Sequence, residues 1–439
     1  MIAKNKGLIA GICLIIFMIA ITVACVKNPQ NSNNITSSWP TEETCLPYVP
    51  PTIEEATSSI IQGGITQAPT QAKTEDTTQA TTQPPTEAPT QPPTEAPTLS
   101  EAYLVAQKLN AGINIGNALD AYGSGTFDDM TDYELSWHNP RIIPELFVYI
   151  KELGFDTVRI PVTWFEHIDA NGKIDSAWMK RVCEVVDFAL DADLYVIINA
   201  HHDKWYMPFS YNKENSLAQI ENVWGQIAMA FRDYEKELIF EGFNEPRLVG
   251  TSGERGFGDA SSYEIINANN AKFVEVVRKT GGNNVDRYLM LTSYMAANNK
   301  VALNEMIIPE DDRLLWSCHA YTPIQFTHKD GNTNNWDEDD YDSVSGIKTA
   351  IRHLKAFIED NNIPVVVTEF GAVYKGNEAD REAWCRYIVD AFSDASIPYI
   401  WWDNNYIEDY PNTYGLIDRE KLISKYPNII KILTRQDNR

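Results

Sequence analysis

Eight short runs rich in β-forming residues recur between residues 101 and 439, and helical patterns separate most of them. Strands that alternate with helices form a parallel sheet. Eight such units match a (β/α)8 barrel, whose usual length is ~250 residues and more with insertions. The sequence also lacks the GxGxxG or P-loop that a doubly wound sheet would carry after an early strand. It therefore predicts an α/β fold with a single (β/α)8 TIM barrel over residues 101–439. The predicted strands are the run near Ile113 and residues 156–162, 194–200, 238–245, 287–293, 313–321, 364–370 and 398–404.

Two of the intervening stretches show helical periodicity clearly. Residues 176–190 repeat apolar side chains at i, i+4, i+7, i+8 and i+11, and Asp175 or Ser176 can cap that helix. Residues 346–359 place four aliphatic side chains on one face. Both stretches are long enough to cover a strand of the barrel, so we expect helices there.

The first 25 residues have the features of an export signal. Lys4 and Lys6 precede an uncharged apolar run from Leu8 to Ala24. Cys25 follows directly, which is similar to the acylated cysteine of bacterial lipoproteins, although Thr22 stands where Leu is usual. Cleavage after Ala24 and an uncleaved anchor are the alternatives. We expect a secreted or cell-surface protein, with membrane attachment only through a lipid on Cys25.

Residues 26–100 have the composition of a disordered linker. Thr, Gln, Pro, Ala and Glu dominate residues 66–98, and the octapeptide QPPTEAPT occurs at 83–90 and again at 91–98. Such a segment buries too little apolar surface to offset its ordering entropy, and its prolines favour an extended chain. The segment is a stalk for the barrel or a leader without a binding role.

The charge of the chain narrows the possible partners. Its 61 Asp and Glu against 36 Lys and Arg give a formal net charge of −25. A nucleic-acid-binding domain needs a basic face to neutralise phosphates, so we expect no nucleic-acid partner. An anionic membrane surface is disfavoured for the same reason. A neutral or a cationic ligand is compatible with this charge.

Polar and aromatic residues gather at the carboxyl ends of seven predicted strands. In a TIM barrel the active site lies at that end. Packing alone does not explain so many ionisable, amide and aromatic groups in these positions. The residues are Asn114, Asn117, Arg159, His201, His202, Asn244, Glu245, His319, Tyr321, Glu369, Trp401 and Trp402.

Two carboxylates in this set indicate the chemistry. Glu245 ends the fourth strand and Glu369 the seventh. A pair of carboxylates that flank the substrate is the catalytic arrangement of glycoside hydrolysis. A nucleophile must stay ionised, for which Arg159 and Tyr321 are candidate partners. A general acid must hold its proton near neutral pH. Glu245 lies in a mostly apolar run, so we expect its pKa to be raised. Asn244 can bond a sugar 2-hydroxyl.

These motifs together resemble glycoside hydrolase family 5, and more narrowly the bacterial endoglucanases of its subfamily 4. The resemblance covers roughly residues 103–435 and rests on GINIGNALDAYG, TVRIPVTW, INAHHD, GFNEPR, HAYTP, VVTEFGA and IWWDN in family order. It implies a retaining double displacement, with Glu245 as acid/base and Glu369 as nucleophile. Ile113 departs from the family, which often has an aromatic residue there. The resemblance implies a supporting shell of Arg159, His201, Asn244, His319 and Tyr321, and sugar contacts from Asn114, Asn117, His202 and Trp402.

Other residues admit two readings. Trp137, Trp205 and Trp336 are candidate sugar platforms, with core packing as the alternative for each. The run His201-His202-Asp203 could be a metal site, but metal-binding barrels usually space their histidines differently, so we expect no metal and no cofactor. His167 belongs to no motif and is expected at the surface or in a loop.

The sequence therefore predicts an exported, monomeric endo-β-1,4-glucanase (cellulase) that cuts internal bonds of cellulose and soluble β-glucans. The partner is the polysaccharide substrate. Xyloglucan, lichenan, xylan or mannan would need the same chemistry, because loops and remote subsites select the polymer. The alternative from another class is a non-catalytic carbohydrate-binding surface protein, against which the intact pair Glu245 and Glu369 argues.

Overall fold

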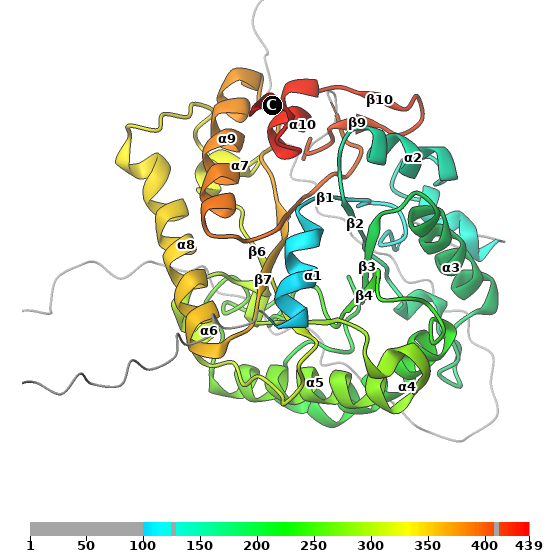
Figure 1. Ribbon diagram of the computed structural model, residues 1–439. Helices are drawn as coiled ribbons and strands as arrows, with labels where there is room; N and C mark the ends of the chain where they lie inside the picture. Colours follow the sequence, from blue (N-terminus) through cyan, green and yellow to red (C-terminus); the bar gives the residue numbers. More distant parts are fainter. Residues whose placement is uncertain (1–99, 124–128, 408–411, 439) are drawn as a thin grey trace, which may run out of the picture. The chain divides into compact units, whose positions relative to one another are not determined.

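Eight parallel strands close into a barrel in their sequence order (Figure 1). The computed structural model describes residues 100–123, 129–407 and 412–438. Every strand overlaps one of the eight predicted runs, so the predicted barrel is confirmed. The strands are β1 (Ala111–Asn114), β2 (Thr157–Ile160), β3 (Tyr195–Asn199), β4 (Leu238–Glu241), β5 (Leu289–Thr292), β6 (Leu314–His319), β7 (Val365–Phe370) and β8 (Tyr399–Trp401).

Helices surround the barrel on the outside (Figure 1). They are α2 (Pro144–Glu152), α3 (Ser176–Asp191), α4 (Lys213–Ala230), α5 (Ala260–Lys279), α6 (Lys300–Asn304), α7 (Ile324–Thr327), α8 (Tyr341–Asn361), α9 (Glu378–Asp394) and α10 (Pro427–Leu433). Short 3-10 turns occupy Met130–Leu135, Phe165–His167, Ser210–Asn212, Gly282–Val285, Tyr294–Ala296 and Gln436–Asn438. A small antiparallel pair, β9 (Ile417–Asp418) and β10 (Ile423–Ser424), follows β8.

Helix α3 shows why the sequence folds locally as it does. The Asp175 side chain accepts hydrogen bonds from the backbone N–H groups of Ala177 and Trp178, which fixes the first turn. The repeating apolar side chains face the barrel and are buried. Helix α8 begins at Tyr341, earlier than predicted, because Asp340 caps it through the N–H of Ser343.

A further helix, α1 (Glu101–Leu109), precedes β1 and was not predicted. Ser100 caps it, and Val105, Ala106 and Leu109 are buried against side chains inside the barrel. Figure 1 shows α1 lying across the strands. The helix closes the amino-terminal end of the barrel. A functional site is therefore expected at the other end, where the carboxyl ends of the strands lie.

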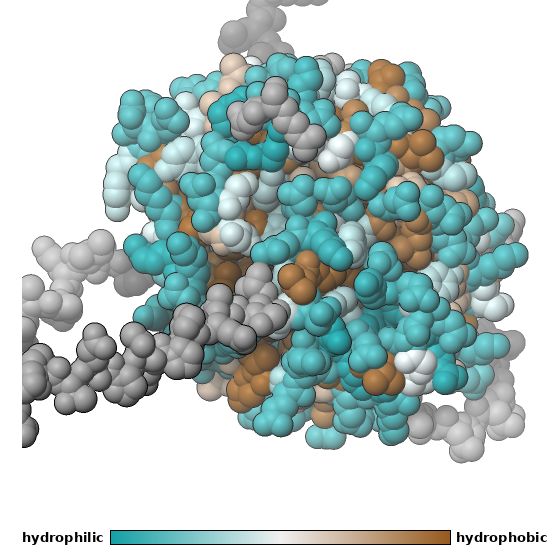
Figure 2. Space-filling model, viewed as in Figure 1, coloured by the Kyte–Doolittle hydropathy of each residue, from teal (hydrophilic) through white to brown (hydrophobic). Residues whose placement is uncertain are grey.

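The predicted signal, Cys25 and almost all of the predicted linker lie outside the described residues. Within residues 100–123, 129–407 and 412–438, no helix combines the length and apolar character needed to cross a membrane. Hydrophilic side chains cover most of the face seen in Figure 2, with smaller apolar patches among them. This surface agrees with the acidic composition of the chain.

His167 lies in a 3-10 turn of the connection after β2, as a loop residue would, but its side chain is in the core, so the expected surface position is wrong. Its side chain is 1% exposed and its ring stacks on Trp178, with the centroids 3.7 Å apart. Neither ring nitrogen has a hydrogen-bond partner among the described residues. Burial lowers the pKa of His167 to about 3. The imidazole is therefore neutral in the folded protein at neutral pH.

Acid should destabilise the protein partly through His167. Its folded-state pKa is about 3 against an ordinary value of 6.5, so the unfolded chain binds an extra proton between these values. The stabilising contribution is complete above about pH 6.5 and declines by about 1.4 kcal/mol per pH unit as the pH falls toward 3. We expect His167→Phe to flatten the pH dependence of the urea-unfolding free energy. Parallel curves for the two proteins would contradict this account.

Candidate active site

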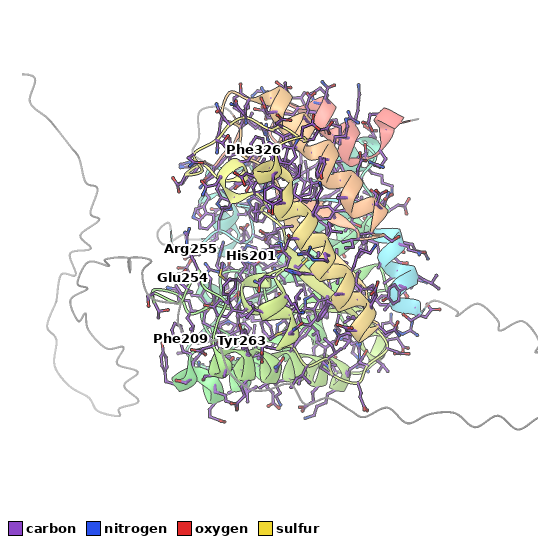
Figure 3. The ribbon with its side chains drawn as sticks, turned by 90° about the vertical axis from the view of Figure 1, so that its left-hand side faces the viewer. His201, Phe209, Glu254, Arg255, Tyr263 and Phe326 are labelled. Carbon is purple, nitrogen blue, oxygen red and sulfur yellow. The ribbon has the colours of Figure 1, made fainter. Side chains whose placement is uncertain are left out.

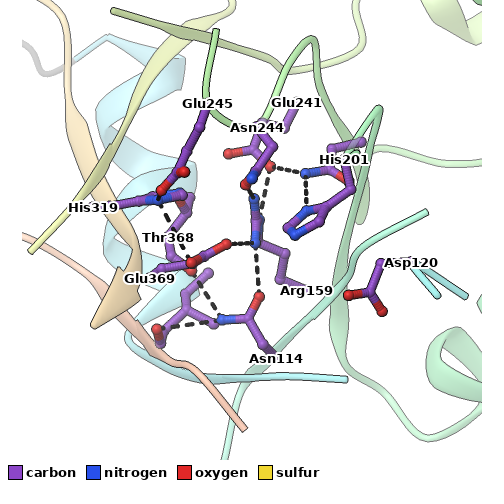
Figure 4. Close-up of polar contacts among 12 residues, drawn as sticks. Asn114, Asp120, Arg159, His201, Glu241, Asn244, Glu245, His319, Thr368 and Glu369 are labelled. Atoms are coloured by element: carbon purple, nitrogen blue, oxygen red, sulfur yellow. Dashed lines mark hydrogen bonds and ion pairs between the residues drawn. The ribbon is translucent and has the colours of Figure 1, made fainter. Parts of the chain in front are cut away.

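Arg159 is the centre of a buried network at the carboxyl end of the barrel (Figure 4). On β2, its Nε donates to Glu241 Oε2 at 2.7 Å and its Nη1 to Glu369 Oε1 at 2.7 Å. The same Nη1 donates to Asn114 Oδ1 at 2.9 Å, and Nη2 donates to Asn244 Oδ1 at 2.7 Å. The guanidinium therefore links β2 to β1, β4 and β7, and it binds the carboxylates of Glu241 and Glu369.

The charge of Arg159 is secured by its carboxylate partners. Burial lowers the pKa of Arg159, but Glu241 and Glu369 outweigh burial and hold that pKa above its usual range. The sequence interpretation named Arg159 as a partner of Glu369, and the structure places them together. The sequence does not predict Glu241 as a partner of Arg159. This residue is fully buried in β4 and also accepts a hydrogen bond from Asn199. A lone carboxylate inside an apolar strand was the available signal, because such a charge needs a buried cation.

Glu369 and Glu245 face each other above this network. Glu369 lies on β7, and its second oxygen accepts a hydrogen bond from the Tyr321 hydroxyl at 2.9 Å. Glu245 follows the end of β4, where the Asn244 N–H bonds the Ala200 carbonyl at 3.0 Å. An oxygen of each carboxylate and a ring nitrogen of His319 lie within 4.8 Å of one another. The predicted pairing of these carboxylates across the barrel mouth is therefore present.

His319 stands between the two carboxylates. Its Nδ1 is 2.8 Å from Glu245 Oε1 and 3.5 Å from Glu369 Oε2. Burial raises the pKa of Glu245, but the hydrogen bond and charge of His319, together with the charge of Arg247, outweigh burial and lower that pKa to about 2. Burial lowers the pKa of His319, and the two carboxylates reverse this and raise it.

The lowered pKa of Glu245 corrects the expectation that it would be raised. The chain around Glu245 is apolar in sequence, but the cations that face it come from other strands and from its own loop. The opposite directions of the two pKa shifts favour an ionised Glu245 beside a protonated His319 in the ligand-free protein. The His319–Glu245 pair nevertheless holds one transferable proton, which the 2.8 Å contact can pass to Glu245.

On the other side of Arg159, the rings of His201 and Trp402 form a wall of the candidate active site. The His201 ring is buried, and it lies parallel to the Trp402 ring with centroids 5.7 Å apart. Burial and the nearby cations lower the pKa of His201 well below its usual value. Asn199 donates to Nδ1 of this neutral ring, so its proton lies on Nε2. The preference for Trp402 over Trp401 agrees with exposure, because Trp401 is fully buried and Trp402 is half-buried.

Gly116 leaves room for Trp402. A Cβ at this position would lie 2.6 Å from the indole of Trp402, which is closer than carbon atoms approach. Gly116→Ala should therefore displace the indole, and we expect kcat/KM on cello-oligosaccharides to fall about 10-fold, or ~1.4 kcal/mol. Steady-state kinetics on cellotetraose measures this effect. Unchanged kinetics would mean that the indole position does not matter for binding.

Of the candidate sugar contacts, Asn114 differs from expectation, and Trp205 and Trp336 follow the core-packing alternative. Asn114 is fully buried, and its amide donates to the carbonyls of Thr368 and Trp401 while its oxygen accepts from Arg159. It is thus a structural residue of the network. Trp205 and Trp336 are only 8% and 9% exposed. Their rings pack against core aromatic residues, so these indoles do not present an open face.

Asn117 and His202 lie partly exposed at the rim. The rings of Tyr122 and Trp137 lie 5.1 and 5.6 Å from the His202 ring. These half-buried rings extend the wall begun by His201 and Trp402. Tyr122 was overlooked as a site residue, although it falls within the first-strand motif. Burial lowers the pKa of His202 to about 4, so this imidazole is neutral.

Two groups of described residues have the ligand types for a metal ion. Asp120, His201 and His202 form one, and the pair Glu245 and Glu369 with His319 forms the other. The second group is held by ion pairs with Arg159 and Arg247 and by a hydrogen bond from Tyr321. The carboxylates of this group have the arrangement for acid–base and nucleophilic chemistry without further groups.

A pocket of about 420 Å³ opens beside Glu245. His319 and Tyr321 form its inner end, and the loop after Glu245 forms one side. Phe257, on this loop, is 58% exposed. The pocket is lined by Glu245 of the carboxylate pair, whereas Trp402 is not among its lining residues.

Comparison with known proteins gives one consistent family. Residues 119–408 match the family described as cellulase (glycosyl hydrolase family 5). Endoglucanase A of Clostridium longisporum is 38% identical over 338 residues, which cover 75% of this chain and 65% of that protein. Endoglucanase 1 of Ruminococcus albus is 39% identical over 332 residues, which cover 75% and 79% of the two chains.

Solved structures agree with these relatives. A GH5-4 broad specificity endoglucanase from Clostridium longisporum has a TM-score of 0.73 at 36% identity, covering 77% of this chain and 98% of that one. A xyloglucan-specific endo-β-1,4-glucanase from a metagenomic library, solved with cellotriose, has a TM-score of 0.73 at 33% identity, covering 76% and 98%.

Proposed function

Because the chain belongs to the cellulase family, glycosyl hydrolase family 5, we propose that it hydrolyses internal β-1,4-glucosidic bonds of cellulose and soluble β-glucans with retention of configuration. The observation that carries this proposal is the carboxylate pair. Oxygens of Glu245 and Glu369 lie within 4.8 Å. This upper limit for one oxygen of each carboxylate lies below the ~6.5–9.5 Å of inverting enzymes and supports the shorter ~5–5.5 Å separation of retaining ones.

In the first step, Glu369 attacks the anomeric carbon and the bond from that carbon to the leaving glycosidic oxygen breaks. Arg159 and Tyr321 each bind one oxygen of Glu369, which orients the carboxylate and keeps it ionised. Glu245 gives its proton to the leaving oxygen. The His319 contact at 2.8 Å supplies that proton to Glu245 when substrate binds.

In the second step, Glu245 takes a proton from water, and the resulting hydroxide attacks the anomeric carbon and releases Glu369 as a carboxylate. Two inversions at one carbon give net retention. Asn244 directs its Oδ1 toward Arg159, so its Nδ2 is the donor available to the sugar 2-hydroxyl. That bond strengthens in the transition state of such reactions.

The choice of polymer is tested by product analysis. Relatives include a xyloglucan-specific endo-β-1,4-glucanase of Bacteroides ovatus, 33% identical over 326 residues, and a lichenase of Caldicellulosiruptor sp. F32. We expect the purified protein to release cello-oligosaccharides of mixed length from carboxymethylcellulose and lichenan. Xyloglucan, xylan and mannan are tested in parallel. Activity confined to xylan or mannan would overturn the assignment to β-glucan, and activity confined to xyloglucan would overturn the assignment to cellulose and unbranched β-glucans. No activity on any polymer would favour a binding protein.

Export belongs to the same proposal. The apolar run ending at Ala24 and the cysteine after it support a signal and a lipid on Cys25. Mass spectrometry of the mature protein from a bacterial host should find a diacylglycerol-modified Cys25 as the first residue. An unmodified amino terminus after Ala24 would contradict lipidation and retain export. We further propose that the exported protein is a monomer, which light scattering tests.

A further inference from the structure

One guanidinium joins Glu245 to a second carboxylate. Arg247 Nη1 donates to Glu245 Oε2 at 3.0 Å, and its Nε donates to Glu254 Oε1 at 3.1 Å. Neither Arg247 nor Glu254 takes part in the reaction steps above. The bridge lies at the wall of the pocket beside Glu245.

The loop that carries the bridge is fixed by its own contacts. Glu254 Oε2 accepts from the Gly250 N–H at 2.8 Å, and the buried Tyr294 hydroxyl lies 2.9 Å from the Gly253 carbonyl and accepts from the Leu248 N–H at 3.1 Å. Figure 3 shows Glu254 and Arg255 together at the edge opposite α1 in that view. The loop therefore holds Arg247 at a set place beside Glu245.

We propose that Arg247 and Glu254 act as a pair of positioning residues that sets how strongly the His319–Glu245 pair holds its proton. This inference rests on the proposed function. The first step needs a proton on Glu245, and the second needs Glu245 without it. A full positive charge 3.0 Å from Glu245 would favour only the second state. Because the Glu254 carboxylate partly neutralises that charge, Glu245 can adopt both the protonated and the ionised state.

Other charged and titratable groups also face Glu245, and they must be weighed against this pair. His319 dominates, since its hydrogen bond contributes more than Arg247 to lowering the pKa of Glu245. The Glu369 carboxylate also faces Glu245, and His202, Tyr206, Tyr321 and His328 are further titratable groups that interact with it. Of the whole set, only Arg247 is bound to a second carboxylate on the same loop, so only its charge is partly compensated there.

The test uses two substitutions with opposite expected effects. The alkaline limb of the kcat/KM profile reports the proton of the His319–Glu245 pair in the free enzyme. Arg247→Gln removes a cation, so the limb should move to higher pH by about 1–3 units. Glu254→Gln leaves Arg247 uncompensated, so the limb should move to lower pH. Arg247→Lys keeps the charge and should restore the wild-type limb.

The control is Glu264→Gln, which removes an exposed carboxylate paired with Lys213 and should leave the limb in place. A purely structural role would lower activity without opposite shifts. Shifts of Arg247→Gln and Glu254→Gln in the same direction, or no shifts, would overturn the inference while the wild-type enzyme remains active. If Arg247→Gln does not fold, the direction for Glu254→Gln decides alone. An inactive wild type would instead refute the proposed function.

Discussion

Glu369→Gln is expected to lower kcat/KM on β-glucan by about 10⁵–10⁶-fold, the size of loss that follows removal of a covalent nucleophile. The amide is too weak a nucleophile to attack the anomeric carbon. Its nitrogen or oxygen can still contact Arg159 or Tyr321, so the thermal unfolding temperature should change little. Initial rates of oligosaccharide release measure the loss. Activity equal to wild type would revive the alternative of a non-catalytic carbohydrate-binding protein with a contaminating hydrolase.

A matched control and a chemical rescue sharpen this test. Glu378→Gln removes an exposed carboxylate at the start of α9 and should leave kcat/KM unchanged. In Glu369→Ala, azide can occupy the vacated space and attack an activated cellobioside, which gives the α-glycosyl azide. In Glu245→Ala, azide attacks the glycosyl-enzyme from the opposite face and gives the β-glycosyl azide. The same anomer from both variants would contradict the assigned roles.

Arg159→Gln should have the second largest effect, on stability as well as activity. Arg159 and Glu241 are both fully buried and joined at 2.7 Å. Removing the cation leaves two buried carboxylates without their partner, which costs about 3–5 kcal/mol. Glu369 also loses a charge that holds it ionised, so kcat/KM should fall by about 10²–10³-fold. Urea unfolding and initial rates measure the two effects.

The double variant Arg159→Gln/Glu241→Gln separates these effects. Without Glu241 one of the unpaired charges is gone, so the free energy of unfolding should recover part of the loss. The activity should not recover, because Glu369 still lacks Arg159. Additive destabilisation in the double variant would show that the two side chains do not act as a buried pair.

The barrel could be predicted because its signal is local and repeated. Each strand is a short apolar run, and each covering helix has its own period and cap, as Asp175 shows for α3. Helix α1 was overlooked because one isolated helix before the first strand adds no unit to the repeat. Its role depends on contacts with the interior of the barrel that only the closed barrel creates.

The positions of the site residues could be predicted, whereas their environments could not. Strand ends converge in any TIM barrel, which brings Glu245 near Glu369. The pKa of Glu245 depends on His319 and Arg247, whose distances are set by loop and strand geometry. Burial of Trp205, Trp336 and Asn114 likewise depends on tertiary packing. The same aromatic or amide residue type occurs in cores and in clefts, so the sequence alone does not distinguish the two positions.

The central claim is that Glu369 forms a covalent bond to the sugar, and trapping this intermediate tests it most directly. A 2-deoxy-2-fluoro cellobioside with an activated leaving group slows both steps, and the second most, so the glycosyl-enzyme accumulates. Peptide mass spectrometry should then find one fluorosugar on Glu369, and none in Glu369→Gln. An adduct on Glu245 would contradict the account, as would hydrolysis with inversion and no adduct.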